Sequence, residues 1–501
     1  MTNESKQPDR LSTGIEGLDT ILRGGLPKNR ILLLEGNPGT GKTTMGLQFL
    51  LEGARNGEVG LYITLSETKE ELTAIAHSHG WSLEGLNIQD LSITEEGLRD
   101  DAHYTIFHPS EVELDETTQA LLKEVENAKP TRIVLDSLSE MRLLAHEALR
   151  FRRQILALKQ YFTGKRCTVL MLDDHTSEQH DRQLASIAHG VIDLEYIPQE
   201  YGKQRHRLRV VKMRGVNFQS GFHDFNIETG GIVVFPRLTA SESPARSRRK
   251  PLVTEVKGLE DLLGGLDYGT CTMFTGPAGI GKSTLALTYA FAAAQRGERA
   301  ALYLFDEGIA NMTTRTSALG IDIKGFIDAG MISARQIDPA ELSPGEFSHL
   351  VSKEVQDNQA SVVVIDSLNG YIMAAPDQRF LIMQFHELLA YLNKMGVLSI
   401  LIVGQYGLIG SMQTPVDLSY LADTVILLRY FEAHGEVRQA ISVLKKRTGR
   451  HERTIREFRI TKGGVHLGPP LREFRGVLTG VPEYGGKGDE LMEGGDDDAQ
   501  Q

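Results

Sequence analysis

The chain has 501 residues, of which 41% are hydrophobic and 24% are charged, and its formal net charge is −12. The length predicts two to four domains, and the composition excludes a wholly disordered or fibrous protein. Two cysteines exclude a disulfide framework and favour a reducing, cytoplasmic environment. The start is polar and no stretch approaches about 18 uninterrupted apolar residues, so we expect neither secretion nor a membrane span. The acidic balance does not favour nucleic-acid binding.

In chain order, the apolar runs 31–36, 61–66, 132–136 and 168–172 predict buried strands. Residues 43–57 have helical spacing and end at a glycine, which is typical of a helix stop. Buried strands that alternate with helices predict an α/β fold, a mostly parallel sheet with helices on both faces. The later segments 205–213 and 230–235 predict antiparallel strands at one edge.

An internal repeat organises the whole chain. Segment 14–44 recurs as 256–284, and Lys42 and Lys282, which end the two Gly-Lys pairs, are 240 residues apart. Later landmarks recur in the same order, and a period this long indicates a duplicated domain. We therefore divide the chain into a first domain (1–238), a polar linker (239–250), a second domain (251–484) and an acidic tail without predicted structure (485–501).

Each copy contains the pattern G-x-x-x-x-G-K-[ST] between a predicted strand and a predicted helix. The backbone N–H groups of such a loop surround phosphate oxygens, at the positive end of the helix that follows. The lysine neutralises the terminal phosphates and the next hydroxyl binds Mg²⁺, so the pattern predicts two sites for ATP and Mg²⁺. The predicted nucleotide-binding residues are Gly36, Asn37, Pro38, Gly39, Thr40, Gly41, Lys42, Thr43 and Thr44 in the first copy, and Gly276, Pro277, Ala278, Gly279, Ile280, Gly281, Lys282, Ser283 and Thr284 in the second.

Acidic residues follow the predicted strands at matching places in both copies. Asp136 and Asp366 each end an apolar strand, where a carboxylate can hold the magnesium or its water together with Thr43 and Ser283. Phosphoryl transfer to water also needs a group that positions or deprotonates the nucleophile. The candidates, each just after a strand, are Glu67, Asp306 and Glu307.

A second kind of landmark is a Lys-x-Arg pair in a strand-like segment. Lys212 and Arg214 in the first copy match Lys445 and Arg447 in the second, and residues two apart in a strand share one face. Charge on the transferring phosphate needs a further cation. We therefore expect each pair to reach the nucleotide of an adjoining subunit; the alternative is a solvated edge strand.

Together the two P-loops, the acidic strand ends, the Asp-Ser pairs 136–137 and 366–367 and the Lys-x-Arg pairs resemble the KaiC family of RecA-like ATPases, from about residue 10 to about residue 480. The resemblance implies tandem RecA-like domains in a double-ring hexamer with ATP between subunits. It also implies a slow ATPase in the first domain, and an autokinase and autophosphatase with ATPase activity in the second.

The resemblance also marks a phosphoacceptor. The family has an adjacent Ser-Thr pair shortly before a strand, and here Ser419 matches the serine, whereas Tyr420 stands in the place of the threonine. A phenol is longer and less flexible than a threonine hydroxyl, so the in-line geometry to a γ-phosphate would differ. Ser419 is therefore the candidate phosphoacceptor.

Three functions compete on these observations. The leading hypothesis is a cytoplasmic, hexameric, ATP-hydrolysing autokinase that acts as a ring switch and has regulatory protein partners. The second is a RecA-like DNA-dependent ATPase, which the basic cluster at 246–250 favours and the acidic balance and 7% aromatic content do not. The third is an ATP-assembled scaffold with little kinase activity, against which the retained Glu67 and Glu307 argue.

Overall fold

The structure is a computed structural model, and it describes residues 9–91, 109–145, 147–175, 182–239, 250–373, 378–405, 419–433, 435–479 and 483–485. The chain divides into two compact units, residues 1–237 and 238–501. Most of the predicted linker and the acidic tail, including the basic cluster up to Arg249, lie outside the described residues. Each unit is described by itself below.

Among the described residues, the first unit contains a nine-stranded sheet in the order β11-β10-β9-β8-β3-β7-β6-β4-β5. The strands from β8 to β5 are parallel, and β9, β10 and β11 are added antiparallel at one edge, as the sequence predicts. The strands are β3 (Ile31–Gly36), β4 (Gly60–Thr64), β5 (Asn87–Asp90), β6 (Arg132–Asp136), β7 (Thr168–Asp174), β8 (Gly190–Ile197), β9 (Arg205–Met213), β10 (His223–Glu228) and β11 (Gly231–Phe235), with a separate pair β1 (Arg10–Leu11) and β2 (Leu26–Pro27).

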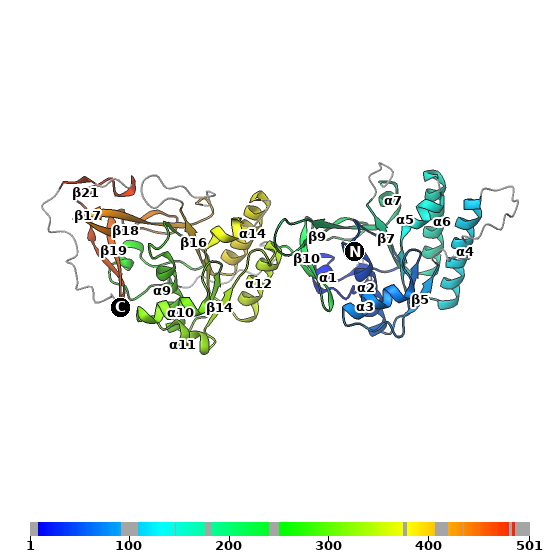
Figure 1. The fold of residues 1–501 in the computed structure, drawn as a ribbon, viewed down its shortest axis with the longest axis horizontal. Coiled ribbons are helices and arrows are strands. Elements are labelled where there is room, and N and C mark those ends of the chain that lie inside the picture. The colour runs from blue at the N-terminus through cyan, green and yellow to red at the C-terminus, as the bar shows by residue number, and fades with distance from the viewer. Residues whose placement is uncertain are drawn as a thin grey trace, which may run out of the picture. The chain divides into compact units, whose positions relative to one another are not determined.

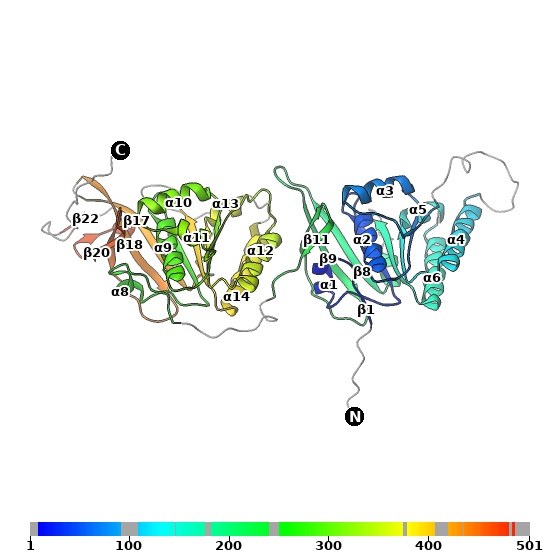
Figure 2. The same cartoon turned by 90° about the horizontal axis from the view of Figure 1, so that it is seen from below.

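Helices cover both faces of this sheet (Figure 2). The central strands are buried on both sides, and their side chains divide between two hydrophobic clusters, one under α1–α3 and one under α4–α7. This explains why the strands are continuous apolar runs rather than alternating ones. The helices are α1 (Glu16–Ile21), α2 (Lys42–Arg55), α3 (Lys69–Ser78), α4 (Pro109–Ala128), α5 (Leu138–Ala145), α6 (Ala148–Lys165) and α7 (Arg182–Ile187).

The second unit repeats the architecture in its described residues, with the sheet order β14-β13-β15-β16-β12-β17-β18-β19-β20. The strands from β14 to β17 are parallel and the last three are antiparallel (Figure 1). The chain therefore folds as two RecA-like α/β units. The strands are β12 (Cys271–Gly276), β13 (Ala300–Leu304), β14 (Ile332–Gln336), β15 (Val362–Asp366), β16 (Leu398–Gly404), β17 (Thr424–Ala433), β18 (Glu436–Lys446), β19 (Ile455–Thr461) and β20 (Gly464–Pro470), followed by the short pair β21 (Phe474–Arg475) and β22 (Glu483–Tyr484).

The helices of the second unit also divide between the two faces. The cluster under α8–α11 includes the side chains on one face of β12, and the cluster under α12–α14 includes those on the other. No helix in the described part of the chain is long and apolar enough to cross a membrane. The helices are α8 (Leu259–Leu263), α9 (Lys282–Gln295), α10 (Ile309–Ala318), α11 (Ile323–Asp328), α12 (Pro344–Asp357), α13 (Leu368–Met373) and α14 (Gln378–Lys394), with a 3₁₀ turn at Val477–Thr479.

A buried histidine gives the first unit a pH-dependent stability. The His223 ring is fully buried; its Nδ1 accepts the Arg237 N–H at 3.0 Å and its Nε2 lies 3.2 Å from the Gln219 carbonyl, so the neutral ring protonated at Nε2 satisfies both partners. Burial lowers the pKa of His223 from 6.5 to about 4. As the pH falls below about 6.5, this histidine takes up a proton in the unfolded chain before it does so in the folded one. The free energy of unfolding of the first unit therefore decreases between pH 6.5 and about pH 4.

We expect wild-type protein to lose about 2 kcal/mol more unfolding free energy than His223→Gln between pH 7.5 and pH 5.0. Trp81 is the only tryptophan of the chain and lies in the first unit, so its fluorescence during urea unfolding reports this unit alone. Equal losses in the two proteins would contradict the assignment.

Candidate nucleotide sites

The two P-loops lie at equivalent places, at the carboxyl ends of the central strands β3 and β12. Each of these strands lies between two parallel neighbours, β7 and β8 in the first unit and β16 and β17 in the second. Open α/β sheets bind ligands outside the carboxyl ends of such strands. Gly41 and Gly281 adopt φ of 90° and 100° immediately before the helix. A Cβ on Gly41 would also lie 2.9 Å from the Ile227 side chain, so the turn requires glycine.

The P-loop lysines are held in place by their own loops. The Lys42 Nζ donates to the Gly36 carbonyl at 2.8 Å and pairs with Asp174 Oδ1, at the end of β7, at 2.7 Å. The Lys282 Nζ donates to the carbonyls of Gly276 at 2.9 Å and Pro277 at 2.6 Å. Burial lowers the pKa of Lys282 to about 8. Each ammonium group therefore bonds two carbonyls of its own loop, and it can exchange these contacts for contacts with a phosphate.

Each site also has a hydroxyl next to a buried carboxylate. In the first unit the Thr43 hydroxyl donates to Asp136 Oδ2 at 3.2 Å and the Tyr62 hydroxyl donates to the same oxygen at 2.5 Å. Burial raises the pKa of Asp136. In the second unit the Ser283 hydroxyl forms a hydrogen bond with Asp366, and burial raises the pKa of Asp366 to about 6.

These oxygen donors fit Mg²⁺, which prefers hard oxygen ligands. No group of three His, Cys, Asp or Glu side chains that could hold a metal occurs within the described ranges. A hydroxyl with one carboxylate therefore suits a cation that takes its other ligands from phosphate and water, which is how Mg²⁺ is usually bound.

Glu67 differs from every other acid of the first site. It follows β4, and its buried Oε2 has no hydrogen-bond partner among the residues that the structure describes. Burial first, and then the nearby charges of Asp136 and Glu71, raise the pKa of Glu67 to about 7. A carboxylate oxygen that is buried and unpaired has free acceptor capacity, which is what orienting a water requires.

The equivalent acids of the second unit are both engaged. The Ser367 hydroxyl donates to Asp306 Oδ2. The Arg315 guanidinium, from α10, donates to both oxygens of Glu307, with Nη2–Oε2 at 2.7 Å and Nε–Oε1 at 3.2 Å. The two sites are therefore similar around the phosphates and different around the candidate catalytic acids.

In both units the side chains of the Lys-x-Arg pair donate to backbone carbonyls of the segment before the adjacent strand. The Lys212 Nζ donates to the Ala185 carbonyl, and Arg214 Nη2 donates to the Ser186 carbonyl at 2.8 Å. In the second unit Lys445 donates to the carbonyls of Ser419 at 3.0 Å and Ala422 at 2.7 Å, and Arg447 donates to that of Tyr420 at 3.2 Å. The arginines lie just after the ends of β9 and β18, so each pair spans the end of its strand, and β9 has the predicted bounds 205–213.

Strand register places each pair away from the P-loop of its own unit. Lys212 pairs with Val191, which pairs with Leu33, three residues before Gly36 at the loop. Each residue of a strand advances about 3.3 Å and each neighbouring strand adds about 4.8 Å, so the Lys212 backbone is roughly 10 Å back and 10 Å to the side. Lys445 pairs with Val425 and then Met273, three residues before Gly276, in the same way.

Ser419 and Tyr420 form a turn before β17. Ser419 is exposed, and the Tyr420 side chain is 54% exposed. Thr414 and Asp417, which precede them, lie outside the described residues.

Comparison with known proteins decides the family. The family model for the KaiC ATPase matches residues 11–239 and again 252–472. The chain belongs to the KaiC family of ATPases. Both copies of the KaiC domain carry a P-loop, and the family binds ATP.

Curated relatives cover almost the whole KaiC-like chain. It is 29% identical over 490 residues to the circadian clock oscillator protein KaiC of Thermostichus vulcanus, with 95% of this chain and 92% of that protein aligned. It is 26% identical over 486 residues to the circadian clock protein KaiC3 of Synechocystis sp., and 95% of both chains is covered. It is 26% identical over 506 residues to the circadian clock oscillator protein KaiC 1 of the same organism, which covers 96% of this chain and 95% of that one.

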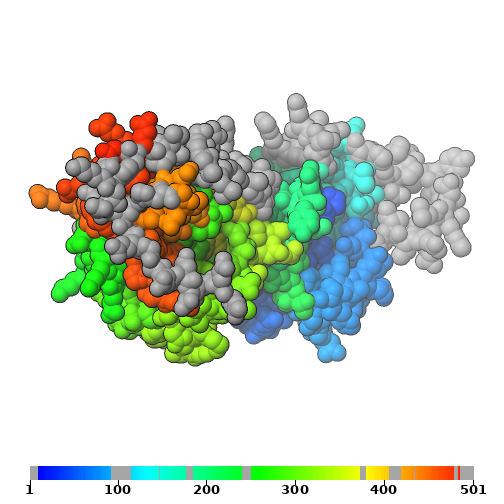
Figure 3. Space-filling model, turned by 60° about the vertical axis from the view of Figure 1, so that its left-hand side comes forward, coloured from blue at the N-terminus to red at the C-terminus, as the bar shows by residue number. Residues whose placement is uncertain are grey.

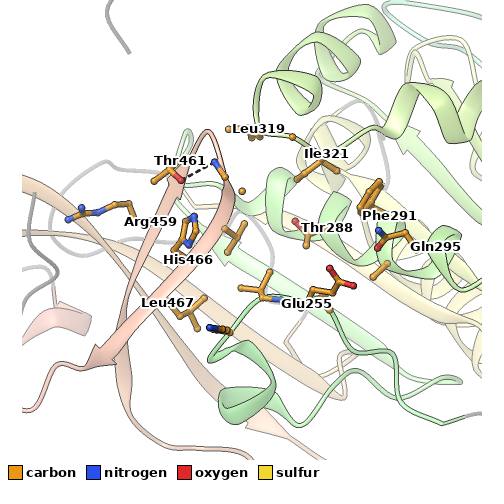
Figure 4. Close-up of a pocket in the computed structure, with 18 residues that line it drawn as sticks. Glu255, Thr288, Phe291, Gln295, Leu319, Ile321, Arg459, Thr461, His466 and Leu467 are labelled. Atoms are coloured by element: carbon orange, nitrogen blue, oxygen red, sulfur yellow. Dashed lines mark hydrogen bonds between the residues drawn. The ribbon is translucent and has the colours of Figure 1, made fainter. Parts of the chain in front are cut away.

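The second KaiC unit also contains a cavity of about 860 Å³ beside the P-loop helix. Phe291 and Gln295 of α9 and Ile321 line one side, and His466 and Leu467 of the β19–β20 hairpin line the other (Figure 4). On the surface of this unit the green segments of α9–α11 lie next to the orange strands of that hairpin (Figure 3). In the first unit the Trp81 ring lies against the corresponding edge strand, at Gly231.

Three residues at the sites were not predicted from the sequence of this KaiC-family chain: Tyr62, Asp174 and Arg315. Asp174 could have been found from the sequence, because it lies two residues after the predicted strand 168–172. In the structure β7 extends to Asp174 and lies parallel to β3. Tyr62 and Arg315 had none, since the residues 240 positions away, Leu302 and Ile75, have different chemistry.

Proposed function

We propose that both units bind ATP with Mg²⁺ and that the first unit hydrolyses it, with Glu67 orienting the attacking water. The observation that carries this proposal is the buried, unpaired Oε2 of Glu67, next to Asp136 in a site whose Lys42 lies at the P-loop. When bound, Mg²⁺ would neutralise negative charge on the phosphates. Thr43 and Asp136 would hold it, and the loop N–H groups would bind the phosphates.

We also propose that the chain forms a hexameric ring in which each Lys-x-Arg pair completes the site of a neighbouring subunit. The register that keeps Lys212 and Lys445 away from their own P-loops supports this arrangement. Cations from a neighbour would stabilise the charge on the transferring phosphate. Nucleotide state and ring contacts would then be linked, as a regulatory switch with protein partners requires.

For the second unit we propose autokinase activity with Ser419 as the phosphoacceptor. Ser419 is exposed, and Lys445 contacts its carbonyl, so the loop that holds the hydroxyl is joined to the cation pair proposed to reach a neighbour's nucleotide. An ATP bound at that neighbour would then lie close to this loop. Tyr420, whose carbonyl contacts Arg447, is the adjacent hydroxyl.

One experiment tests both activities. Full-length protein is incubated with ATP and Mg²⁺, released phosphate is measured, and phosphopeptides are mapped in the same sample. We expect slow phosphate release and phosphoserine at position 419, and neither in the Lys42→Ala/Lys282→Ala protein, which lacks the phosphate-binding ammonium groups. Equal release by the double variant would overturn the ATPase proposal, and modification at other residues alone would overturn the assignment of Ser419.

A further inference from the structure

Arg315 joins the two sides of the second nucleotide site. Its Nε and Nη2 donate to the two oxygens of Glu307, at 3.2 and 2.7 Å, and its Nη1 donates to the Thr284 hydroxyl at 2.8 Å. Thr284 belongs to the first turn of the P-loop helix α9, and Glu307 follows β13. The guanidinium therefore connects the phosphate-binding element to the candidate catalytic acid.

The local sequence explains why Arg315 reaches both partners. Helix α10 begins at Ile309, directly after Gly308, so Arg315 lies two turns from Glu307. Long side chains on a helix point back toward its N-terminus, which here is the direction of Glu307. Met312 and Thr316 of the same helix are fully buried, and Met312 belongs to the hydrophobic cluster on this side of the sheet, so their packing fixes the rotation of α10 about its axis.

The first unit has no equivalent contact among its described residues. The position 240 residues before Arg315 is Ile75, which packs on the hydrophobic core, and Glu67 keeps its unpaired Oε2. Thr44, the counterpart of Thr284, contacts His79 at 3.4 Å instead. The same two partners, an acid and a threonine, are therefore bridged in one unit and separate in the other.

A bidentate guanidinium–carboxylate pair is among the stronger hydrogen-bonded contacts in proteins. It fixes the plane of the carboxylate and uses one acceptor position on each oxygen. Turning Glu307 toward a water would break two charge-assisted hydrogen bonds at once. The pair is about 30% exposed on each side, so solvent weakens the contact without removing it.

We infer that Arg315 is a positioning residue that restrains Glu307. The second unit would therefore hydrolyse its bound ATP more slowly than the first unit hydrolyses its own, and would keep it for longer. The inference rests on the proposed function, extended to Glu307 as the candidate acid of the second unit at the place that Glu67 has in the first. Because the restraint acts on hydrolysis, ATP would persist at the site where a hydroxyl of a neighbouring chain is the proposed acceptor.

The test replaces Arg315 by the residue of the first unit. Full-length Arg315→Ile is compared with its parent in chains that all carry Glu67→Gln, so that only the second unit turns over. We expect kcat for phosphate release to rise about tenfold with KM unchanged, since two charge-assisted hydrogen bonds no longer hold Glu307. Lys324→Gln, which removes an exposed charge of the same unit, is the control and leaves kcat unchanged.

Two further measurements separate restraint from other roles. In a Glu307→Gln background, Arg315→Ile should change kcat less than twofold, because its effect passes through Glu307. Calorimetric affinity for a non-hydrolysable ATP analogue should also stay within twofold. A fall or no change in kcat, a rise that persists in Glu307→Gln, or a loss of analogue affinity overturns the inference. If Lys282→Ala leaves the rate of phosphate release unchanged, the proposed function itself is overturned. Failure of the inference and failure of the proposed function are therefore distinguishable.

Discussion

Glu67→Gln is expected to lower ATP hydrolysis by the first unit about 100-fold or more, because a positioned general base contributes about 10² to 10⁴ to such reactions. The amide keeps the size and polarity of the side chain and loses the charge that attracts the proton of a water. The rate is measured as phosphate release at saturating ATP, in chains that all carry Glu307→Gln so that the second unit is silent.

Glu70→Gln is the matched control, since Glu70 is an exposed acid three residues further along the chain. It should leave the rate within twofold. Glu67→Gln should still bind ATP with the affinity of the parent, because Lys42 and the loop are intact. A Glu67→Gln protein that keeps a third or more of the parental rate would contradict the role of Glu67.

Mixing two inactive variants is expected to restore about one quarter of the parental hydrolysis rate. One variant carries Lys42→Ala and has an intact Lys-x-Arg pair, and the other carries Lys212→Ala/Arg214→Ala and has an intact P-loop. In a ring with head-to-tail contacts, equal and random mixing places an intact loop beside an intact pair at about one interface in four. Glu307→Gln in all chains again silences the second unit.

The controls are each variant alone, which should be inactive, and a mixture prepared without exchange of subunits, which should stay inactive. If the Lys-x-Arg pair served the P-loop of its own chain, no mixture would recover activity. If the pair played no part in hydrolysis, Lys212→Ala/Arg214→Ala would be active by itself. Either result would contradict the proposed arrangement.

Much of the fold was predictable because buried parallel strands leave a strong pattern. Continuous apolar runs mark β3, β4, β6 and β7 and their counterparts, and the duplication checks each run against a second copy. The P-loops were predictable for a local reason, since a tight turn around phosphate needs glycines at fixed spacing.

What the sequence left out depends on contacts between distant segments. Arg132 begins the predicted strand β6, and its side chain, 1% exposed, pairs with Glu58 and donates to the carbonyls of Ser12 at 2.7 Å and Phe49 at 2.8 Å. The counterpart at the start of β15 is Val362. The burial of a charged side chain such as Arg132 depends on packing between distant segments, and no local sequence pattern predicts it.

The same holds at the candidate sites. Tyr62 lies inside an apolar strand run, yet its hydroxyl reaches Asp136 from the adjacent strand. Arg315 lies on a helix face that is otherwise unremarkable in sequence, and its partners are 8 and 31 residues away. Sequence spacing finds residues that share one loop, whereas side chains that converge from separate elements need the register and the packing.

The register of Lys212 and Lys445 has a consequence for the whole protein at low abundance. Under the proposed arrangement, a chain on its own would lack the Lys-x-Arg cations at both of its P-loops, because the register keeps Lys212 and Lys445 away from them. Turnover per chain would then depend on how much of the protein is present, because dilution removes the neighbour that each site needs. The amount of the protein would itself act as a regulator of its hydrolysis.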